Sequence, residues 1–342
     1  MPVGTRGTVK AIDTRDLAGL RPGMVLANTY HLWRAPGHEV VARAGGLHRW
    51  TGWAGNMLTD SGGYQVVSLA RVGRALVDED GVVFDGGARL TPEDAVRVQE
   101  ALAPDVMMAL DQPVAFPATA EMTAEATRRT HRWAARCRVA WSGGAIELWG
   151  IVQGGFDRPL REESTLATRD LDLPGYAIGG LSLGEPQQVT DEFLQVCTER
   201  LPVDRPRYLM GVGTEREMLA AIRLGVDLFD CVWPTRLART GAALVGAGRV
   251  NLLNSAFGRD FGPLEGGCSC RACAVHSRAQ VRHLLRRGEL LGYRLLTIHN
   301  LHHTLELARG ARAAVLEGRF EQFAAARLRH ATASGGGEGR PI

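Results

Sequence analysis

The sequence predicts an α/β protein of the (β/α)8 TIM barrel class, and three observations support this. Short apolar runs alternate with segments of helical spacing along nearly the whole chain, a pattern typical of a parallel sheet covered by helices. These runs number eight, which is the number of strands in a closed barrel of this class. Almost every run ends in a carboxylate, an amide or glycines, and such barrels build their active sites at the strand ends. The runs are Met1–Thr5, Met24–Thr29, Met57–Asp60, Val106–Asp111, Leu148–Gln153, Tyr176–Leu181, Tyr208–Val212 and Leu228–Trp233.

The composition is that of a soluble globular protein. The 342 residues are 45% hydrophobic and 23% charged, and the formal net charge is only +3, so the molecule as a whole is not strongly basic. No apolar run approaches the roughly 18 residues that cross a membrane. The N-terminus has no basic region followed by an apolar core, as a secretory signal would. We therefore expect a cytoplasmic protein without a membrane partner.

The helical segments have recognisable start signals. Thr91-Pro92 precedes Glu93–Ala103 and places a proline at the first helical position. Further segments with helical spacing are Glu121–Ala140, Gln187–Leu201, Glu215–Leu224, Ser277–Leu291 and Leu301–Glu317. The alternation breaks after the eighth run. We therefore expect a single barrel domain over residues 1–330 that contains a metal-binding subdomain at about 251–305, and a disordered tail over residues 331–342.

The last apolar run carries Asp230 to the tip of a buried strand. A carboxylate in that position is poorly solvated and points outward, which suits a nucleophile or an acid–base group, although it could also cap the next turn. Arg236 and Arg239 follow in an expected loop, and arginines suit a phosphate-bearing substrate. The other strand ends with polar residues or glycines are Asn28, Asp60 to Tyr64, Asp111, Gln153 to Gly155, Gly179 to Leu181 and Gly211.

Three cysteines are clustered as Cys268-x-Cys270-x2-Cys273. In a reducing cytosol such a cluster favours a metal over a disulfide. Zn2+ takes four tetrahedral ligands, sulfur included, and a site with no room for an open position is typical of a structural ion. Spacing alone does not identify the fourth ligand, for which the candidates are His276, His283, His299, His302 and His303.

Taken together, the motifs resemble the bacterial-type tRNA-guanine transglycosylases, the queuine tRNA-ribosyltransferase family. The resemblance implies a barrel enzyme that exchanges the wobble guanine of GUN-anticodon tRNAs for a 7-deazaguanine base such as preQ1, in queuosine modification. It implies double displacement through a covalent enzyme–RNA intermediate, one structural Zn2+ per chain, and a homodimer that binds the tRNA anticodon loop. The matching pieces span about residues 1–325 and are Asn28–Leu32, Thr59–Gln65, Gly150–Gly155, Gly179–Leu181, Met210–Gly213, Phe229–Val232, Pro234–Arg236, the three cysteines and Ile298–Leu301.

The same resemblance assigns roles to single residues. Asp230 corresponds to the nucleophile and Asp60 to the general acid/base, while Tyr64 and Met210 correspond to the two faces that sandwich the base. The implied substrate-binding set is Asp60, Ser61, Gly62, Gly63, Tyr64, Asp111, Gln153, Gly179, Gly180, Leu181 and Met210. The implied RNA-binding set is Gly211, Val212, Gly213, Thr214, Glu215, Arg216, Glu217, Thr235, Arg236, Leu237, Ala238 and Arg239. The implied metal ligands are Cys268, Cys270, Cys273 and His299.

A few positions depart from the family's usual pattern. Gln112, Pro113 and Leu183 lie beside the expected pocket for the 7-substituent of the base, which leaves the choice of preQ1, queuine or another base open. The chain also begins inside the expected first strand, so the barrel is N-terminally short. Alternative functions are a relative with a DNA target, a non-catalytic subunit of a heterodimer, and a metal-dependent TIM-barrel hydrolase. The presence of both Asp60 and Asp230 argues against the non-catalytic subunit, and the scarcity of histidines at the strand tips argues against the hydrolase.

Overall fold

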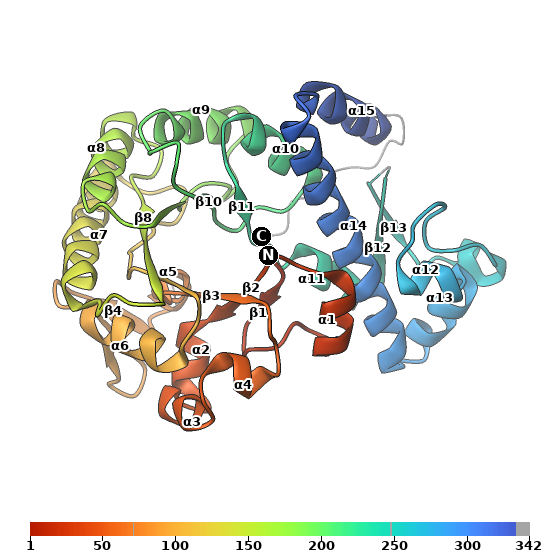
Figure 1. Cartoon of the computed structure of the whole chain (residues 1–342), viewed down its shortest axis with the longest axis horizontal. Coiled ribbons are helices and arrows are strands. Elements are labelled where there is room, and N and C mark those ends of the chain that lie inside the picture. The colour runs from red at the N-terminus through yellow and green to blue at the C-terminus, as the bar shows by residue number, and fades with distance from the viewer. Residues whose placement is uncertain (71, 247, 333–342) are drawn as a thin grey trace.

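The computed structural model of the chain describes residues 1–70, 72–246 and 248–332. Its centre is one sheet of eight parallel strands in the order β1-β2-β3-β7-β8-β9-β10-β11, and Figure 1 shows these strands as a ring with helices around it. A parallel bridge between Pro2 and Cys231 joins the first strand to the last and closes the sheet, which confirms the predicted barrel. The strands are β1 (Val3–Gly4), β2 (Met24–Asn28), β3 (Asn56–Asp60), β7 (Val106–Met108), β8 (Glu147–Val152), β9 (Gly175–Ile178), β10 (Arg207–Leu209) and β11 (Leu228–Phe229).

Most of the barrel strands end earlier than the predicted runs. The run from Val106 to Asp111 is a strand only as far as Met108, and Ala109 to Asp111 follow it as a buried connection. The last run ends as a strand at Phe229, and Trp233–Arg239 forms helix α11 where we predicted a loop. Pro234 lies in the first turn of α11, where its missing N–H removes no helical hydrogen bond. Asp230 therefore lies in the short connection between β11 and α11.

Helices cover the outside of the barrel. The start signal before α6 works as predicted, because the Thr91 side chain accepts a hydrogen bond from the Asp94 N–H and the Asp94 carboxylate accepts one from the Thr91 N–H. The covering helices are α1 (Thr14–Leu20), α2 (Thr29–Arg34), α3 (His38–Arg43), α4 (Leu47–Thr51), α5 (Gly63–Ala70), α6 (Pro92–Leu102), α7 (Ala120–Ala140), α8 (Arg158–Arg169), α9 (Gln187–Thr198) and α10 (Glu215–Arg223). A small antiparallel sheet of β4 (Ala75–Val77), β5 (Val82–Phe84) and β6 (Arg89–Leu90) follows α5.

The barrel interior is a packed core. Its buried side chains come from all eight strands except β11, whose Leu228 packs against them while partly exposed, so the ring encloses no channel. The buried members of this cluster are Val3, Leu26, Leu58, Val106, Met108, Trp149, Ile151, Ala177 and Tyr208. Polar chemistry is therefore confined to the rim, where the strands end.

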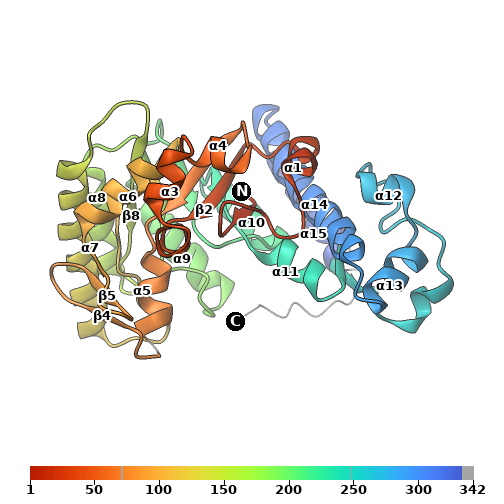
Figure 2. The ribbon, with the colours of Figure 1, turned by 90° about the horizontal axis from the view of Figure 1, so that it is seen from below.

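The C-terminal part of the chain forms a second packed region beside the barrel. It comprises the hairpin β12 (Ala242–Val245) and β13 (Gly248–Asn251), the 3-10 helix η1 (Ser255–Arg259), and helices α12 (Arg271–Val275), α13 (Arg278–Arg286), α14 (Leu290–Leu316) and α15 (Phe320–Thr332). Figures 1 and 2 both show α12 and α13 on the side of α14 that faces away from the barrel. Their apolar side chains form a separate cluster with α14, which includes Val281, Leu285 and Leu296.

Our two predicted C-terminal helices are wrong in their boundaries. The first, expected to reach Leu291, ends at Arg286. The second, expected from Leu301, begins at Leu290 and runs without a break to Leu316. The stretch that we excluded contains the buried polar residues Thr297, His299 and Asn300, which interrupt the apolar periodicity of a helix.

Within the described residues, none of the helices has the length and apolar character that a membrane crossing would need. Of the predicted tail, residues 331 and 332 belong to α15, and residues 333–342 lie outside the described part of the chain.

Candidate active site and metal centre

Asp60 ends strand β3 at the rim of the barrel, partly exposed. Its Oδ1 accepts a hydrogen bond from the Thr29 N–H at 2.9 Å, and its Oδ2 accepts one from the Asn28 side chain. Burial from solvent raises the pKa of Asp60 to about 7, and the negative charge of Asp230 contributes in the same direction. The hydrogen bonds from Thr29 and Asn28 oppose this shift. Asp60 can therefore both give and take a proton near neutral pH.

Asp230 is held by two donors that bond the same carboxylate oxygen. The Tyr208 hydroxyl donates to Oδ1 at 2.6 Å, and the Gly211 N–H donates to Oδ1 at 2.7 Å. Burial, followed by the charge of Asp230, raises the pKa of Tyr208 well above its ordinary value. The hydroxyl therefore stays protonated at physiological pH and remains a donor. Both bonds engage Oδ1, so the two oxygens of this carboxylate have different surroundings.

Asp111, Ser61 and Gln153 form a buried polar group beside the two rim carboxylates. The Ser61 hydroxyl donates to Asp111 Oδ1 at 3.2 Å, and Gln153 Nε2 donates to Asp111 Oδ2 at 2.6 Å. Burial raises the pKa of Asp111 to about 6, although both hydrogen bonds favour the ionised form. Among the described residues no partner is found for Gln153 Oε1, which is buried. A buried amide oxygen without a partner points to a ligand.

Three glycines make room for this group. A Cβ on Gly63 would lie 1.9 Å from Asp111 Oδ1, so no larger residue fits there. A Cβ on Gly179 would lie 2.6 Å from Gln153 Nε2, and one on Gly180 would lie 2.5 Å from Gln153 Oε1. Gly180 also has a φ of +69°, which glycine adopts without strain. The turn after β9 therefore passes directly against the Gln153 amide, as the predicted substrate-binding set requires.

The remaining predicted substrate-binding residues differ in exposure. The Tyr64 side chain, in the first turn of α5, is 69% exposed, which is unusual for a tyrosine and leaves its ring free to stack. Met210 follows β10, is partly buried and packs against the barrel interior. Leu181 is buried, and Gly62 has a φ of +87° in the turn after Asp60.

The predicted RNA-binding residues divide into exposed and buried members. Gly211, Arg216, Arg236 and Arg239 are exposed. The buried members are Thr235, Leu237 and Ala238 of α11, together with Val212 and Gly213. Three further members are partly exposed and already engaged: Glu215 bonds Arg327, Glu217 accepts from Ser182, and Thr214 caps α10. The surface that could contact RNA phosphates is therefore smaller than the predicted set.

The three clustered cysteines meet one histidine of α14. The ligand atoms of Cys268, Cys270, Cys273 and His299 all lie within 4.8 Å of one another. His299 Nδ1 is 3.7, 3.6 and 3.3 Å from the three sulfurs in that order. His299 Nε2 lies 2.6 Å from the Leu244 carbonyl oxygen. A carbonyl can only accept, so Nε2 carries the proton and Nδ1 offers its lone pair to the cluster. These four residues could hold a metal ion, and the geometry selects His299 from the five candidate histidines.

Sequence reasoning missed several residues that shape the site. Asn28 ends a predicted strand and belongs to a matching motif but received no role, and Tyr208 lies in an apolar run where a tyrosine indicates core. Arg161 of α8 is fully buried and donates to the Gly179 carbonyl oxygen at 2.8 Å. Glu185, also buried, accepts from the Leu183 N–H at 2.8 Å. Apart from Asn28, no matching motif includes these residues, because each acts through contacts that only the fold creates.

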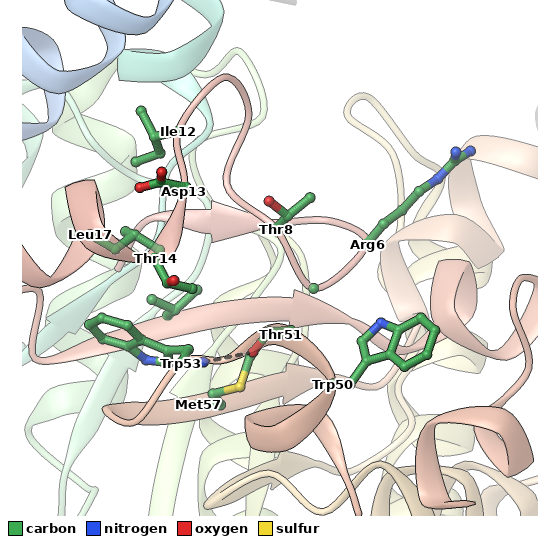
Figure 3. Close-up of a pocket in the computed structure, with 12 residues that line it drawn as sticks. Arg6, Thr8, Ile12, Asp13, Thr14, Leu17, Trp50, Thr51, Trp53 and Met57 are labelled. Carbon is green, nitrogen blue, oxygen red and sulfur yellow. Dashed lines mark hydrogen bonds between the residues drawn. The ribbon is translucent and has the colours of Figure 1, made fainter. Parts of the chain in front are cut away.

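A cavity of about 330 Å3 lies away from this site, between the loop after β1, helix α1 and the residues around α4. Figure 3 shows Arg6 and Trp50 on one side of it and Trp53 and Leu17 on the other. None of the predicted site residues lines this cavity.

Comparisons with known proteins agree with the geometry of the rim. A family model described as queuine tRNA-ribosyltransferase matches residues 1–333. A queuine tRNA-ribosyltransferase of Desulforudis audaxviator is 53% identical over 338 residues, which cover 96% of this chain and 90% of the relative. One from a Synechococcus species is 52% identical over 330 residues, with 95% and 88% covered. One from Thermus thermophilus is 50% identical over 329 residues, with 95% and 85% covered.

Proposed function

The chain belongs to the queuine tRNA-ribosyltransferase family, and from this premise we propose how it acts as a tRNA-guanine transglycosylase in queuosine modification. The reaction replaces the wobble guanine of a GUN-anticodon tRNA by a 7-deazaguanine base. It takes place at the barrel rim, in two displacements at the same sugar carbon. Because each displacement inverts that carbon, the product keeps the original configuration.

Asp230 is the nucleophile. Tyr208 and Gly211 hold its Oδ1, so we assign the attack on the sugar carbon to Oδ2. The bond from this carbon to guanine breaks as the carbon–Oδ2 bond forms, which gives a covalent enzyme–RNA intermediate. The incoming base then displaces Asp230 from the same carbon.

Asp60 is the general acid/base of both steps. It gives a proton to the leaving guanine and takes one from the incoming base, so the carboxyl returns to its starting state. A group whose pKa is about 7 is suited to this exchange at neutral pH. The charge of Asp230 contributes to the raised pKa of Asp60, which supports the assignment of both carboxylates to one reaction.

Asp111 and Gln153 recognise the base. The Asp111 carboxylate can accept hydrogen bonds from the N1–H and the exocyclic amine of a guanine-like base. Gln153 Oε1 supplies a further acceptor that the protein leaves without a partner among the described residues. The base, flipped out of the anticodon loop, stacks on the exposed Tyr64 ring, with Met210 on its other face.

We propose preQ1 as the incoming base. Of the residues that depart from the usual pattern, Gln112 is turned toward α7: Arg129 donates to its side-chain oxygen at 2.8 Å, and its N–H donates to Thr130 at 3.0 Å. Gln112 is thus engaged with α7.

The nucleotides on either side of the wobble position contact Arg236 and Arg239. These two arginines are exposed, and their guanidinium groups suit the phosphates of the anticodon loop.

The metal in the cysteine cluster is a structural Zn2+. Three thiolates and one imidazole would hold this Zn2+ with the four ligands that it prefers, and they would leave no open position for substrate. Among the described residues this group alone could hold a metal. It lies between the α12 segment and α14, outside the barrel ring, which disfavours a metal-dependent hydrolase. The ion would fasten α12 to α14 and so order the subdomain at about 251–305.

The chain forms a homodimer through the metal-bearing region. Large apolar side chains there are exposed, with Phe261 at 81%, Val275 at 70% and Leu290 at 82%. We propose that a partner subunit covers these side chains, since apolar surface that is contiguous and exposed marks association sites. Sedimentation of the cytoplasmic enzyme should give a dimer, and Leu290→Glu should shift it toward the monomer.

The observation that carries the proposal is the pair of rim carboxylates, Asp60 and Asp230, beside the buried Asp111–Gln153 group. The test is incorporation of labelled guanine into tRNA, with a denaturing gel for the covalent adduct. Asp230→Asn should lower incorporation at least about 1,000-fold and abolish the adduct, while tRNA binding persists.

Asp227→Asn is the matched control, because Asp227 lies three residues earlier, at the opposite end of β11, where its carboxylate accepts from the Arg207 N–H. An asparagine keeps that acceptor, so activity should stay near the wild-type level. Incorporation that survives in Asp230→Asn would refute the nucleophile assignment. Adding preQ1, queuine or guanine to the trapped adduct then identifies the base that releases it.

A further inference from the structure

Helix α8 presents a polar face to the barrel. Arg161, Ser164, Thr165 and Thr168 are spaced as one helical face, and none of their side chains is more than 2% exposed. Such a face is usually apolar, because burying polar groups is costly unless every one of them is hydrogen-bonded. The face must therefore have specific partners on the strands it covers.

Arg161 links the two turns that follow β8 and β9. Its Nη2 and Nε donate to the Gly155 carbonyl oxygen at 2.6 and 3.2 Å, and its Nη1 donates to the Gly179 carbonyl oxygen at 2.8 Å. One planar guanidinium thus bridges backbone positions 24 residues apart in the chain. The Thr165 hydroxyl in turn donates to the Arg161 carbonyl oxygen at 2.7 Å.

The bridged turns hold the Gln153 amide in place. Gly179 and Gly180 pass so close to this amide that a Cβ on either would overlap it. Gly154 approaches α8 equally closely, since its Cβ would lie 2.7 Å from the Arg161 Cα. The Ser164 hydroxyl accepts from the Gln153 N–H at 2.9 Å, so α8 bonds both the backbone of Gln153 and the turns around it.

We propose that Arg161 is a positioning residue for base specificity: by fixing the Gly155 and Gly179 carbonyls it fixes Gln153, and through Gln153 the orientation of Asp111. This inference rests on the proposed function of the Asp111–Gln153 group. Arg161 touches neither the base nor the reacting atoms. A lysine has one ammonium in place of the planar fork and cannot bond both carbonyls in the same geometry.

The test compares Arg161→Lys with Arg207→Lys. Arg207 is also buried and also bonds backbone carbonyls, those of Leu201 at 2.6 Å and Pro202 at 3.2 Å, but it begins β10 at the opposite end of the barrel. Both variants lose a buried guanidinium, so both should melt at a lower temperature. Only Arg161→Lys should change how the base is bound.

The measured quantities are KM for labelled guanine, KM for tRNA, kcat and the melting temperature. In Arg161→Lys we expect KM for guanine to rise at least about tenfold, with kcat and KM for tRNA changed less than about threefold, as for lost uniform binding. In Arg207→Lys KM for guanine should stay within about twofold of wild type. A purely structural role would move the two variants alike.

Ser164→Ala provides a second, milder variant if Arg161→Lys does not fold, and it should raise KM for guanine about threefold. An unchanged KM for guanine in the folded variant, or an equal rise in Arg207→Lys, would overturn the inference. Failure of the proposed function is a separate result, because there the wild-type protein itself incorporates no guanine.

Discussion

The barrel rim and the cysteine cluster are built in opposite ways. The rim brings together Asp60, Asp111, Gln153 and Asp230 from the ends of four strands that are distant in sequence. Part of its capacity for hydrogen bonding and proton transfer is unused, because one buried amide oxygen has no partner among the described residues and two carboxyls have raised pKa values. In the cluster every ligand atom faces the others, and the second nitrogen of His299 is already bonded. Unsatisfied polar groups are suited to binding a ligand reversibly, whereas a complete set of metal ligands is suited to stabilising the fold. Changes at the rim should therefore affect rate and affinity, and changes in the cluster should affect melting.

The largest test of this contrast is Cys270→Ser. Because the variant loses one ligand of the closed shell, we expect it to lose the metal and to melt about 10 °C lower, while kcat at low temperature changes less than about threefold. Metal analysis and thermal unfolding measure the effect, and a chelator should lower the melting temperature of the wild type similarly. His302→Ala is the control, since His302 lies on α14 outside the ligand group. Unchanged metal content and melting temperature in Cys270→Ser would remove the contrast.

The second test is the pH dependence of kcat/KM. Asp111 must be ionised to accept from the base, and its pKa is about 6; Asp60 must be protonated to release guanine, and its pKa is about 7. We therefore expect a maximum between about pH 6 and 7, with a fall of about tenfold per unit on either side. A profile that is flat from about pH 5 to 9 would contradict these roles.

The raised pKa values of Asp60 and Asp111 also predict how the stability of the folded protein varies with pH. Their folded-state pKa values lie above the ordinary 3.8, so the folded protein keeps protons that the unfolded chain releases. Their contribution to stability is complete below about pH 4 and is lost as the pH rises through about 6 and 7. Replacing Asp60 by asparagine should flatten this part of the stability curve.

The smallest effect is expected at the rim surface, in Arg239→Ala. Its guanidinium is exposed on α11, so removal of one phosphate contact should raise KM for tRNA about threefold to tenfold and reduce the salt slope of binding by about one. KM for the free base should not change. Arg138→Ala, on the exposed end of α7 at the opposite face of the barrel, is the control. An equal loss in both variants would indicate a general charge effect.

The strands and the rim residues could be predicted because each depends on a local pattern. An apolar run that ends in Asp60, Asp111, Gln153 or Asp230 predicts both the strand and the side chain at its tip. Helix α8 was not among the predicted helices, and most of its buried face consists of polar residues, Arg161, Ser164, Thr165 and Thr168. The same reason hid the middle of α14, where Thr297, His299 and Asn300 are buried.

The residues that support the site could not be predicted from the sequence, for a different reason. Arg161 bonds the backbone carbonyls of Gly155 and Gly179. Because every residue has a backbone carbonyl, no residue type in the sequence identifies such a partner. Tyr208 reads as a core residue, and only the fold brings its hydroxyl to Asp230. The choice of His299 among five histidines likewise required either the resemblance or the course of α14.

Asn300, the residue after His299, bonds the carbonyl oxygens of Pro234 and Ala242 at 3.0 Å and accepts from the Leu244 N–H at 2.8 Å. Two consecutive residues of one helix therefore join the cysteine cluster and the start of the arginine-bearing helix α11 that follows Asp230. A chain that folded without its ion would keep the bonds of Asn300 and the buried apolar contacts of α14 with the barrel, while α12 would lose its attachment to α14. Supply of the metal during synthesis would thus set how long each molecule survives heating, and would leave the rate at which it exchanges a base nearly unchanged.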